Sequence, residues 1–254
     1  MGCNDKILVI RRRFVLVNYC LLRNKGDFVV RTEIEQLGIG ALVFDGFGTL
    51  FDLESAAPAF DLVFHGRGLE VSRWWRARQL AYTRRCILTR RYQNLWVLME
   101  QALDDASRHF QVAISSQIRN DLCSEYFRLA MFPEVPEVLN ALHNRYKLIL
   151  LSHGTQFMLE KVVSHNKLDS LLDSVLSVDI IQSYKPELKV YELATQNVNL
   201  PLNAFSYVGG NPMDLAGAKA YGMKTIWLRR NAPAIRLMGL IADISITSLK
   251  DLSA

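Results

Sequence analysis

The sequence lacks any apolar run that approaches the roughly 20 residues a membrane-spanning helix needs. It also lacks a basic stripe. The formal net charge is +5, and segment 1–38 alone carries +3, with seven Lys or Arg against four Asp or Glu. A membrane span and a nucleic-acid surface are therefore both disfavoured. The 254 residues contain no internal repeat or low-complexity tract, and their number suits a core domain with a smaller one attached.

Cysteine is scarce, and its spacing excludes common metal motifs. None of the four cysteines (Cys3, Cys20, Cys86 and Cys123) forms a CxxC pair, and a chain of this length needs no disulfide staples. Free thiols in a reducing compartment follow from this pattern, and we expect a cytoplasmic protein.

The N-terminal segment 1–38 is expected to be an extension outside the fold. Its RRRF run at 11–14 superficially fits a twin-arginine export signal. However, the apolar stretch that follows is short, Arg23 and Lys25 come directly after it, and no small-residue cleavage site is clear. The initial MGC hints at lipidation, but Lys6 occupies the Ser/Thr position of the myristoylation pattern. We favour an extension or an upstream start codon over export.

Short apolar runs alternate with helical patterns after residue 38, which predicts an α/β fold with an open parallel sheet. The expected strands are ALVFD (41–45), KLILLS (147–152), VLSVD (175–179), FSYVGG (205–210), KTIWLR (224–229) and ISIT (244–247). Residues 55–131 contain almost no β-rich run, so we expect an all-helical cap domain inserted after the first strand. The Rossmann-like core would comprise 39–54 and 132–254.

Polar or glycine-rich signals follow four of the predicted strands, at the edge where open α/β sheets bind ligands. They are Asp45 with the turn GFGT, Ser152-His153-Gly154, the loop Tyr184-Lys185-Pro186, and GGNPMD at 209–214. A carboxylate on such a turn can act as a nucleophile or a metal ligand. Lys185 can hold Asp45 ionised, and Asp214 can orient Lys185 or activate a water. From spacing alone, the alternative has equal weight: Asp45 caps the next segment and Lys185 lies on the surface.

Four motifs, in chain order, resemble those of the haloacid dehalogenase superfamily. They are FDGFGTLFD (44–52), LLSHG (150–154), YKP (184–186) and GGNPMD (209–214). The resemblance covers residues 40–250 and implies a Rossmann-like core in which Asp45 is the attacking group.

Two positions distinguish the phosphatases of this superfamily from its dehalogenases. The phosphatases carry a second Asp two residues after the nucleophile, where this chain has Phe47, and an acidic residue where it has Asn211. Phe47 cannot protonate a leaving group, and the missing carboxylate weakens a Mg²⁺ site. The resemblance therefore implies a dehalogenase without a metal or another cofactor.

Two further segments resemble group II L-2-haloacid dehalogenases. WRARQLAYT (75–83) resembles the cap segment with the halide-binding arginine, and the match falls on Arg76. KPELKVYELA (185–194) resembles the segment around the lysine, including Tyr191. This resemblance implies hydrolytic dehalogenation of short L-2-haloalkanoic acids to D-2-hydroxy acids. Because such enzymes are commonly dimers, it also implies a homodimer.

The resemblance also implies a mechanism. Asp45 would attack C2 of the substrate with inversion, and Arg76 would stabilise the departing halide. Ser152, with nearby backbone N–H groups, would bind the substrate carboxylate, and Lys185 would hold Asp45 ionised. Water would then hydrolyse the ester on Asp45.

Other residues would support these groups. Thr49 and Tyr191 would hydrogen-bond the nucleophile and orient it. Asn211 and Asp214 would position the lysine and the water. Further candidates for substrate contacts are Gly46, Phe47, Trp75 and His153, with Leu80 and Phe64 as either pocket or core residues.

Three residues depart from the family pattern. His153 replaces the usual Asn that helps to bind halide and substrate; it can still donate a hydrogen bond, but it is bulkier and titrates near neutral pH. Gly209 replaces Ser, and the lost hydroxyl weakens the support of Asp214 and Lys185. Phe47 replaces Tyr.

Two other functions stay open on the sequence alone. One is a phosphatase-like hydrolase of small phosphorylated metabolites, which Mg²⁺-dependent phosphate release would reveal. The other is a non-enzymatic descendant that binds a small acid or a partner protein, which binding without turnover would reveal.

Overall fold

A computed structural model describes residues 37–196, 198–230 and 242–253, and the predicted extension 1–38 lies outside these residues except for its last two. Six strands form one parallel sheet in the order β3-β2-β1-β4-β5-β6. The strands are β1 (Ala41–Phe44), β2 (Lys147–Ser152), β3 (Ser174–Ser177), β4 (Phe205–Gly209), β5 (Lys224–Leu228) and β6 (Ile244–Ile246). The predicted Rossmann-like parallel sheet is therefore confirmed.

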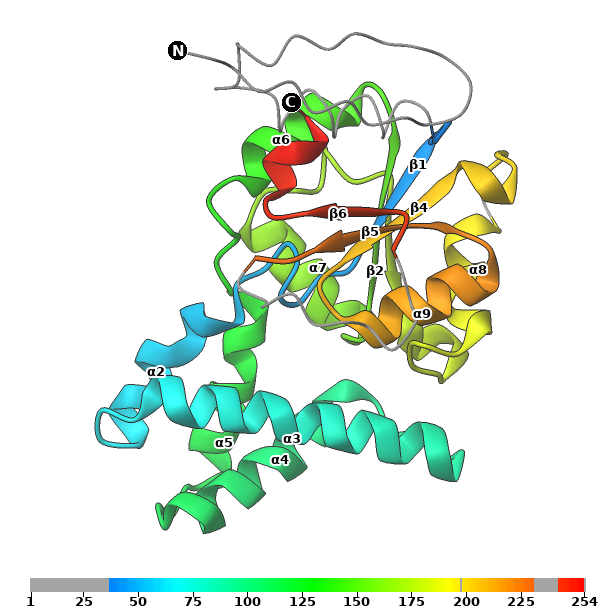
Figure 1. The fold of residues 1–254 in the computed structure, drawn as a ribbon. Coiled ribbons are helices and arrows are strands. Elements are labelled where there is room, and N and C mark those ends of the chain that lie inside the picture. The colour runs from blue at the N-terminus through cyan, green and yellow to red at the C-terminus, as the bar shows by residue number, and fades with distance from the viewer. Residues whose placement is uncertain (1–36, 197, 231–241, 254) are drawn as a thin grey trace, which may run out of the picture.

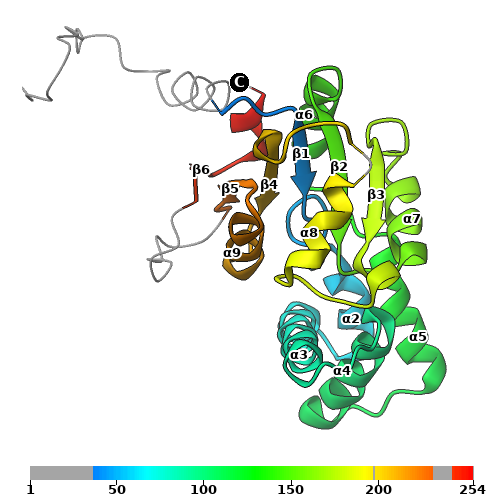
Figure 2. The same ribbon diagram turned by 90° about the vertical axis from the view of Figure 1, so that its right-hand side faces the viewer.

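The central strands are buried on both faces because helices cover each side of the sheet (Figure 2). On β1, Leu42 and Phe44 belong to one hydrophobic cluster, whereas Ala41 and Val43 belong to the other. This alternation is the two-residue period of a strand. The flanking helices are α6 (Val135–His143), α7 (Gln156–His165), α8 (Leu188–Thr195) and α9 (Pro212–Tyr221).

Between β1 and β2, helices are the only regular elements of the described chain, apart from single bridge residues at 47, 51 and 131. The α-helices of this helical insertion are α2 (Ala57–Val63), α3 (Gly68–Thr89), α4 (Leu95–Phe110) and α5 (Ser116–Ser124). Short 3-10 helices flank them at η1 (Leu53–Ala56) and η2 (Glu125–Phe127). Figures 1 and 2 show the insertion beyond the carboxyl ends of the strands, at the edge expected to bind ligands.

Helix α3 buries one long face, and its spacing explains why. Val71, Trp75, Gln79 and Thr83 recur every four residues, and all are buried. Side chains of Asn94 and Ser115 accept hydrogen bonds from backbone N–H groups at the starts of α4 and α5. Helix α3 therefore packs through this face, and Arg76, the residue after Trp75, lies at its border and is half-buried.

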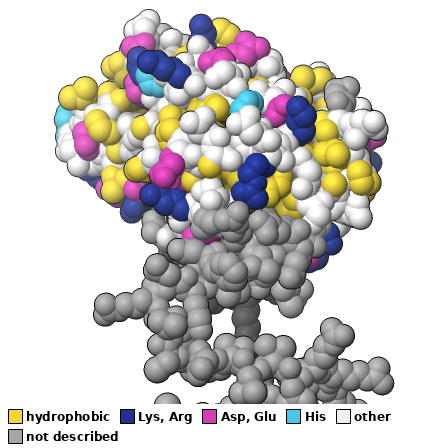
Figure 3. All heavy atoms as spheres, turned by 90° about the horizontal axis from the view of Figure 1, so that it is seen from above, with side chains coloured by type: hydrophobic (Ala, Val, Ile, Leu, Met, Phe, Trp, Pro, Cys, Tyr) yellow, Lys and Arg dark blue, Asp and Glu magenta, His cyan; other side chains and the backbone are white. Residues whose placement is uncertain are grey.

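The surface gives no sign of a single-sign patch on the side drawn in Figure 3. Basic and acidic side chains of described residues are interspersed there with apolar and uncharged groups. None of the helices in the described part of the chain has the length and apolar character needed to cross a membrane.

Candidate active site

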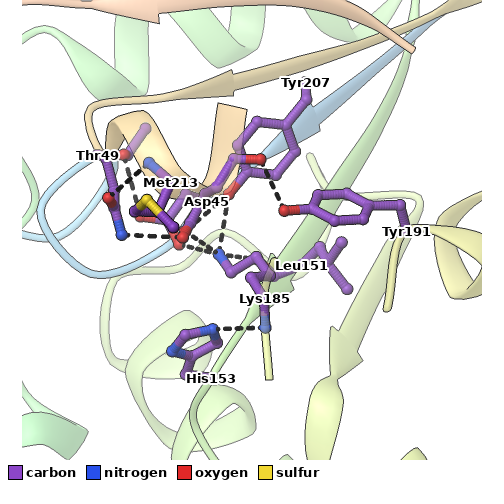
Figure 4. Close-up of polar contacts among 10 residues, drawn as sticks. Asp45, Thr49, Leu151, His153, Lys185, Tyr191, Tyr207 and Met213 are labelled. Carbon is purple, nitrogen blue, oxygen red and sulfur yellow. Dashed lines mark hydrogen bonds and ion pairs between the residues drawn. The ribbon is translucent and has the colours of Figure 1, made fainter. Parts of the chain in front are cut away.

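The four predicted strand ends converge on the ammonium of Lys185 (Figure 4). Asp45 follows β1 directly, and Asp214 lies in the first turn of α9. Lys185 Nζ is 2.5 Å from Asp45 Oδ1 and 3.1 Å from Asp214 Oδ2. The hydroxyl of Tyr207, on β4, lies 2.9 Å from the same nitrogen. We call Asp45, Lys185, Tyr207 and Asp214 the lysine cluster.

The charged side chains of the lysine cluster are largely buried. The side chains of Lys185 and Asp214 are 1% and 5% exposed, whereas that of Asp45 is 14% exposed. Burial alone would lower the pKa of Lys185, but the charges of Asp214 and Asp45 raise it above its usual value. Burial raises the pKa of Asp214, and the charge of Asp45 adds to this against the opposing effect of Lys185. One ammonium is thus shared by two carboxylates, and only Asp45 is partly open.

The turn after Asp45 is organised by a single carbonyl. The carbonyl oxygen of Gly46 accepts hydrogen bonds from the backbone N–H groups of residues 49, 50 and 51. This tight turn places Thr49 Oγ1 3.3 Å from Asp45 Oδ2, as donor. A Cβ on Gly46 would lie 3.0 Å from Ser152 Oγ, so glycine here lets the turn approach β2 closely.

Ser152, at the end of β2, carries a buried hydroxyl that no described residue satisfies. Buried polar groups normally have partners, so an unpartnered hydroxyl beside the nucleophile turn is a candidate contact for a ligand. The role of Ser152 in binding the substrate carboxylate stays a prediction.

The start of α9 orients Asp214. Asn211 caps the helix: its Oδ1 accepts from the backbone N–H of Met213 at 3.1 Å, and its Nδ2 donates to Asp214 Oδ1 at 2.8 Å. The prediction that Tyr191 hydrogen-bonds Asp45 differs from the structure. Its buried hydroxyl instead donates to the backbone carbonyl of Asp214 at 2.6 Å, which uses its one O–H.

His153 differs from the expectation that it titrates near neutral pH. Its Nε2 accepts the backbone N–H of Lys185 at 3.1 Å, so the ring proton of this neutral imidazole is on Nδ1. Burial lowers the pKa of His153 well below its usual value, and the positive charges of Lys185 and Arg76 lower it further. His153 therefore stays neutral and keeps one N–H.

Arg76 lies on α3 of the helical insertion and is half-buried. Its charge acts on His153 and on the buried Tyr126, and its Nη1 lies 3.5 Å from Gln79 Oε1. The Nε2 atom of Gln79 is buried without a partner among the described residues. The structure thus brings Arg76 together with the strand ends, as predicted from the motif.

Three other predicted substrate contacts, Phe47, Phe64 and Trp75, lie in the hydrophobic core, whereas Leu80 does not. Trp75 is buried, donates its indole N–H to the carbonyl of Met99 and packs against Phe60. Phe64 is also buried, whereas Leu80 is partly exposed. Phe47 is buried against Tyr126, with ring centroids 4.9 Å apart.

Two site residues were not predicted, Tyr207 and Gln79. Tyr207 lies in FSYVGG, where an aromatic residue predicts only a buried strand. Gln79 is a polar residue on the apolar face of α3, and that break in the pattern was a usable signal. Among the described residues, no group of three or more His, Cys, Asp or Glu has the arrangement of a metal site.

Comparison with known proteins agrees with this geometry. Residues 81–228 match the family model described as haloacid dehalogenase-like hydrolase. The chain is 41% identical over 213 residues to (S)-2-haloacid dehalogenase of Pseudomonas sp. strain YL, covering 84% of this chain and 92% of that protein. It is 30% identical over 216 residues to (S)-2-haloacid dehalogenase H-109 of Pseudomonas putida, covering 85% and 96%.

Solved structures point the same way. The L-2-haloacid dehalogenase of Xanthobacter autotrophicus, with chloropropionic acid covalently bound, superposes with a TM-score of 0.79 at 27% identity. The match covers 85% of this chain and 97% of that chain. With the motifs, the sheet order and these relatives in agreement, the chain belongs to the family of haloacid dehalogenase-like hydrolases.

Proposed function

We propose that the protein hydrolyses short L-2-haloalkanoic acids to D-2-hydroxy acids through an ester on Asp45. The observation that carries the proposal is the 2.5 Å ion pair between Lys185 and a partly open Asp45 at the carboxyl end of β1. This carboxylate is held in one orientation before substrate arrives, as a nucleophile requires. The names of the relatives, and the covalent chloropropionic acid adduct of one of them, support the reaction class.

The substrate would bind between the lysine cluster and the helical insertion. Its carboxylate would accept hydrogen bonds from the unpartnered hydroxyl of Ser152 and from backbone N–H groups. Its C2 would face Asp45, and the carbon–halogen bond would point toward Arg76. Residues 55–131 would act as the cap that closes this edge, with 39–54 and 132–254 as the core.

The first step would be a displacement at C2. A carboxylate oxygen of Asp45 forms a bond to C2 while the carbon–halogen bond breaks, and the halogen leaves as an anion with the bonding electron pair. Arg76 stabilises the charge that develops on the halide, and the same positive charge helps to keep His153 neutral. Halide departs without a proton, which is why Phe47 is acceptable where phosphatases have an acid.

The second step would regenerate Asp45. Water attacks the ester carbonyl of Asp45 and gives one proton to Asp214. The acyl–oxygen bond then breaks, the leaving alkoxide takes that proton and departs as the D-2-hydroxy acid, and the carboxyl group of Asp45 releases the remaining water proton to solvent. Asp214 is buried with its pKa raised, so it suits a group that takes the water proton. Lys185 and Asn211 hold Asp214 for this task.

Halide release from L- and D-2-chloropropionate in the presence of EDTA tests the proposal. Release from the L isomer alone, lost in Asp45→Asn, is the expected result. A single turnover in H₂¹⁸O with enzyme in excess adds a direct readout, because the first product oxygen comes from Asp45 and not from solvent. Release that requires Mg²⁺, or phosphate release from small phosphate esters instead, would overturn the assignment.

Two further expectations remain predictions. A homodimer predicts about twice the chain mass of 29.0 kDa in light scattering after gel filtration. A cytoplasmic location predicts recovery of the protein in that cell fraction.

A further inference from the structure

Tyr207 links two charged groups of the site without carrying a charge. Its side chain is fully buried in β4. Its hydroxyl oxygen lies 2.9 Å from Lys185 Nζ and 3.3 Å from Asp214 Oδ2 (Figure 4). Because a phenol has both an O–H and accepting lone pairs, it can accept from the ammonium and donate to the carboxylate.

The ammonium of Lys185 has more oxygen acceptors around it than it has protons. Its three N–H donors are shared among Asp45 Oδ1, the Leu151 carbonyl, the Tyr207 hydroxyl and Asp214 Oδ2. Asp214 lies within ion-pair distance and accepts the proton of Tyr207. Without that hydroxyl, Asp214 keeps the ammonium beside it but loses its neutral donor.

Gly209 provides the space for this tyrosine. Residues 207 and 209 point to the same face of β4. A Cβ on Gly209 would lie 3.0 Å from Tyr207 Cε1 and 3.4 Å from Asp45 Cβ. The tyrosine ring would have to shift by a few tenths of an ångström, and its hydroxyl is held at the other end by Lys185 and Asp214.

We propose that Tyr207 is a positioning residue, whose hydroxyl sets the geometry of Lys185 and Asp214, and that Gly209 is glycine so that this ring fits. In the family pattern, a serine at position 209 provides a hydroxyl. In this chain Tyr207, two residues earlier on the same strand, provides one instead. The kinetic part of this inference rests on the proposed function, and the geometric part does not.

The proposal predicts the sign of a pH effect. A hydrogen bond donated to a carboxylate favours the charged form and lowers its pKa. Loss of the Tyr207 hydroxyl therefore raises the pKa of Asp214 further, and the acid limb of kcat moves to higher pH by about half to one unit. The other titratable groups around Tyr207 and Asp214 are Asp45, Lys185 and the hydroxyl of Tyr191. All three are still present in a variant that lacks only the Tyr207 hydroxyl.

The first experiment compares Tyr207→Phe with Tyr221→Phe. Tyr221 also loses a side-chain hydrogen bond, to Thr195, but lies outside the lysine cluster. We expect kcat to fall about tenfold in Tyr207→Phe, with the acid limb displaced, and to stay within about twofold of wild type in Tyr221→Phe. A lower melting temperature in Tyr207→Phe with an unmoved pH profile would mean a structural role only and would sink the inference.

A second set of variants tests the link to Gly209. Tyr207→Phe combined with Gly209→Ser restores a hydroxyl to the same space, because the freed ring can shift. The matched control, Tyr207→Phe with Gly209→Ala, adds the same bulk without a hydroxyl. We expect the serine variant to recover kcat to within about threefold of wild type and the alanine variant to stay at or below Tyr207→Phe. Equal activity of the two double variants would refute the pairing.

A measurement without substrate separates this inference from the proposed function. The carboxyl carbon of Asp214, assigned by its loss in Asp214→Asn, is titrated by NMR in wild type and in Tyr207→Phe. An upward shift of its pKa in Tyr207→Phe supports the role of the hydroxyl, even if no haloacid is turned over. An unchanged titration overturns the inference, even if the chain proves to be a dehalogenase.

Discussion

The two sides of the candidate site differ in how completely their polar groups are paired. On the core side, the lysine cluster uses its donors internally, with Asn211 and Thr49 as further partners. On the side toward the helical insertion, Ser152 Oγ and Gln79 Nε2 are buried without partners among the described residues. The difference indicates that the core side is assembled in advance for chemistry and that the other side completes its hydrogen bonds with a ligand.

The largest effect is expected on the core side, from Lys185→Met. This change leaves Asp45 and Asp214 as two buried carboxylates without their shared cation, so we expect halide release to fall by about 10³-fold or more and unfolding stability to fall by about 3–5 kcal/mol. Lys189→Met, on the exposed part of α8, is the control, with an expected change of less than about 0.5 kcal/mol. Retention of most activity in Lys185→Met would show that the reaction does not need the ion pairs of the lysine cluster.

The second effect concerns the insertion side, through Arg76→Ala. If the guanidinium stabilises the leaving halide, kcat falls by about 10²- to 10³-fold with little change in melting temperature. Arg73→Ala, three residues earlier on α3 and paired with Glu54 at the surface, is the matched control and should leave kcat within about twofold. Equal effects of the two changes would remove Arg76 from the reaction.

A pair of serines sharpens the comparison further. Ser152→Ala removes a hydroxyl that has no partner among the described residues, so stability should be unchanged or higher while KM rises about tenfold. Ser177→Ala removes a buried hydroxyl that donates to the Gly154 carbonyl at 2.6 Å, so stability should fall by about 1–2 kcal/mol. Thermal melts and initial rates measure both effects. A loss of stability in Ser152→Ala, with no such loss in Ser177→Ala, would contradict the division into hydroxyls paired within the protein and hydroxyls that bind a ligand.

The smallest effect is expected from the titration of His153. Its folded-state pKa lies well below its unfolded value, so it favours folding above the unfolded pKa of about 6.5 and opposes folding as pH falls. Wild type should therefore lose about 1–2 kcal/mol more stability than His153→Asn between pH 7 and pH 5. Urea unfolding at both pH values measures this, and parallel curves for the two proteins would mean that the imidazole accepts a proton in the fold.

The parts of the site that could be predicted are those fixed by topology. Asp45, Ser152, Lys185 and Asp214 follow strands or open a helix, and parallel strands bring such positions to one edge. Arg76 was found only through its motif, because nothing in a helical pattern says which arginine faces a strand end in another part of the chain.

The parts that could not be predicted depend on side-chain packing. Tyr207 looks like any aromatic residue of a buried strand, and only the distance of its hydroxyl from Lys185 reveals a polar task. The partner of Tyr191 and the tautomer of His153 depend on contacts of about 3 Å, which motif spacing does not resolve. Trp75 belongs to the repeating buried face of α3, and this periodicity agreed better with core than with substrate contact.

The position of β1 in the sheet has a consequence for how the chain reaches its native state. Ala41 pairs with Lys147 on one side and with Phe205 on the other. The strand that precedes Asp45 is therefore the first of the described strands to be synthesised, but both of its partner strands are synthesised much later. The helical insertion, by contrast, is rich in local contacts and can form early. During synthesis, the nucleophile is therefore among the last groups to reach its final surroundings, and the emerging chain carries no working reaction centre until most of it has been made.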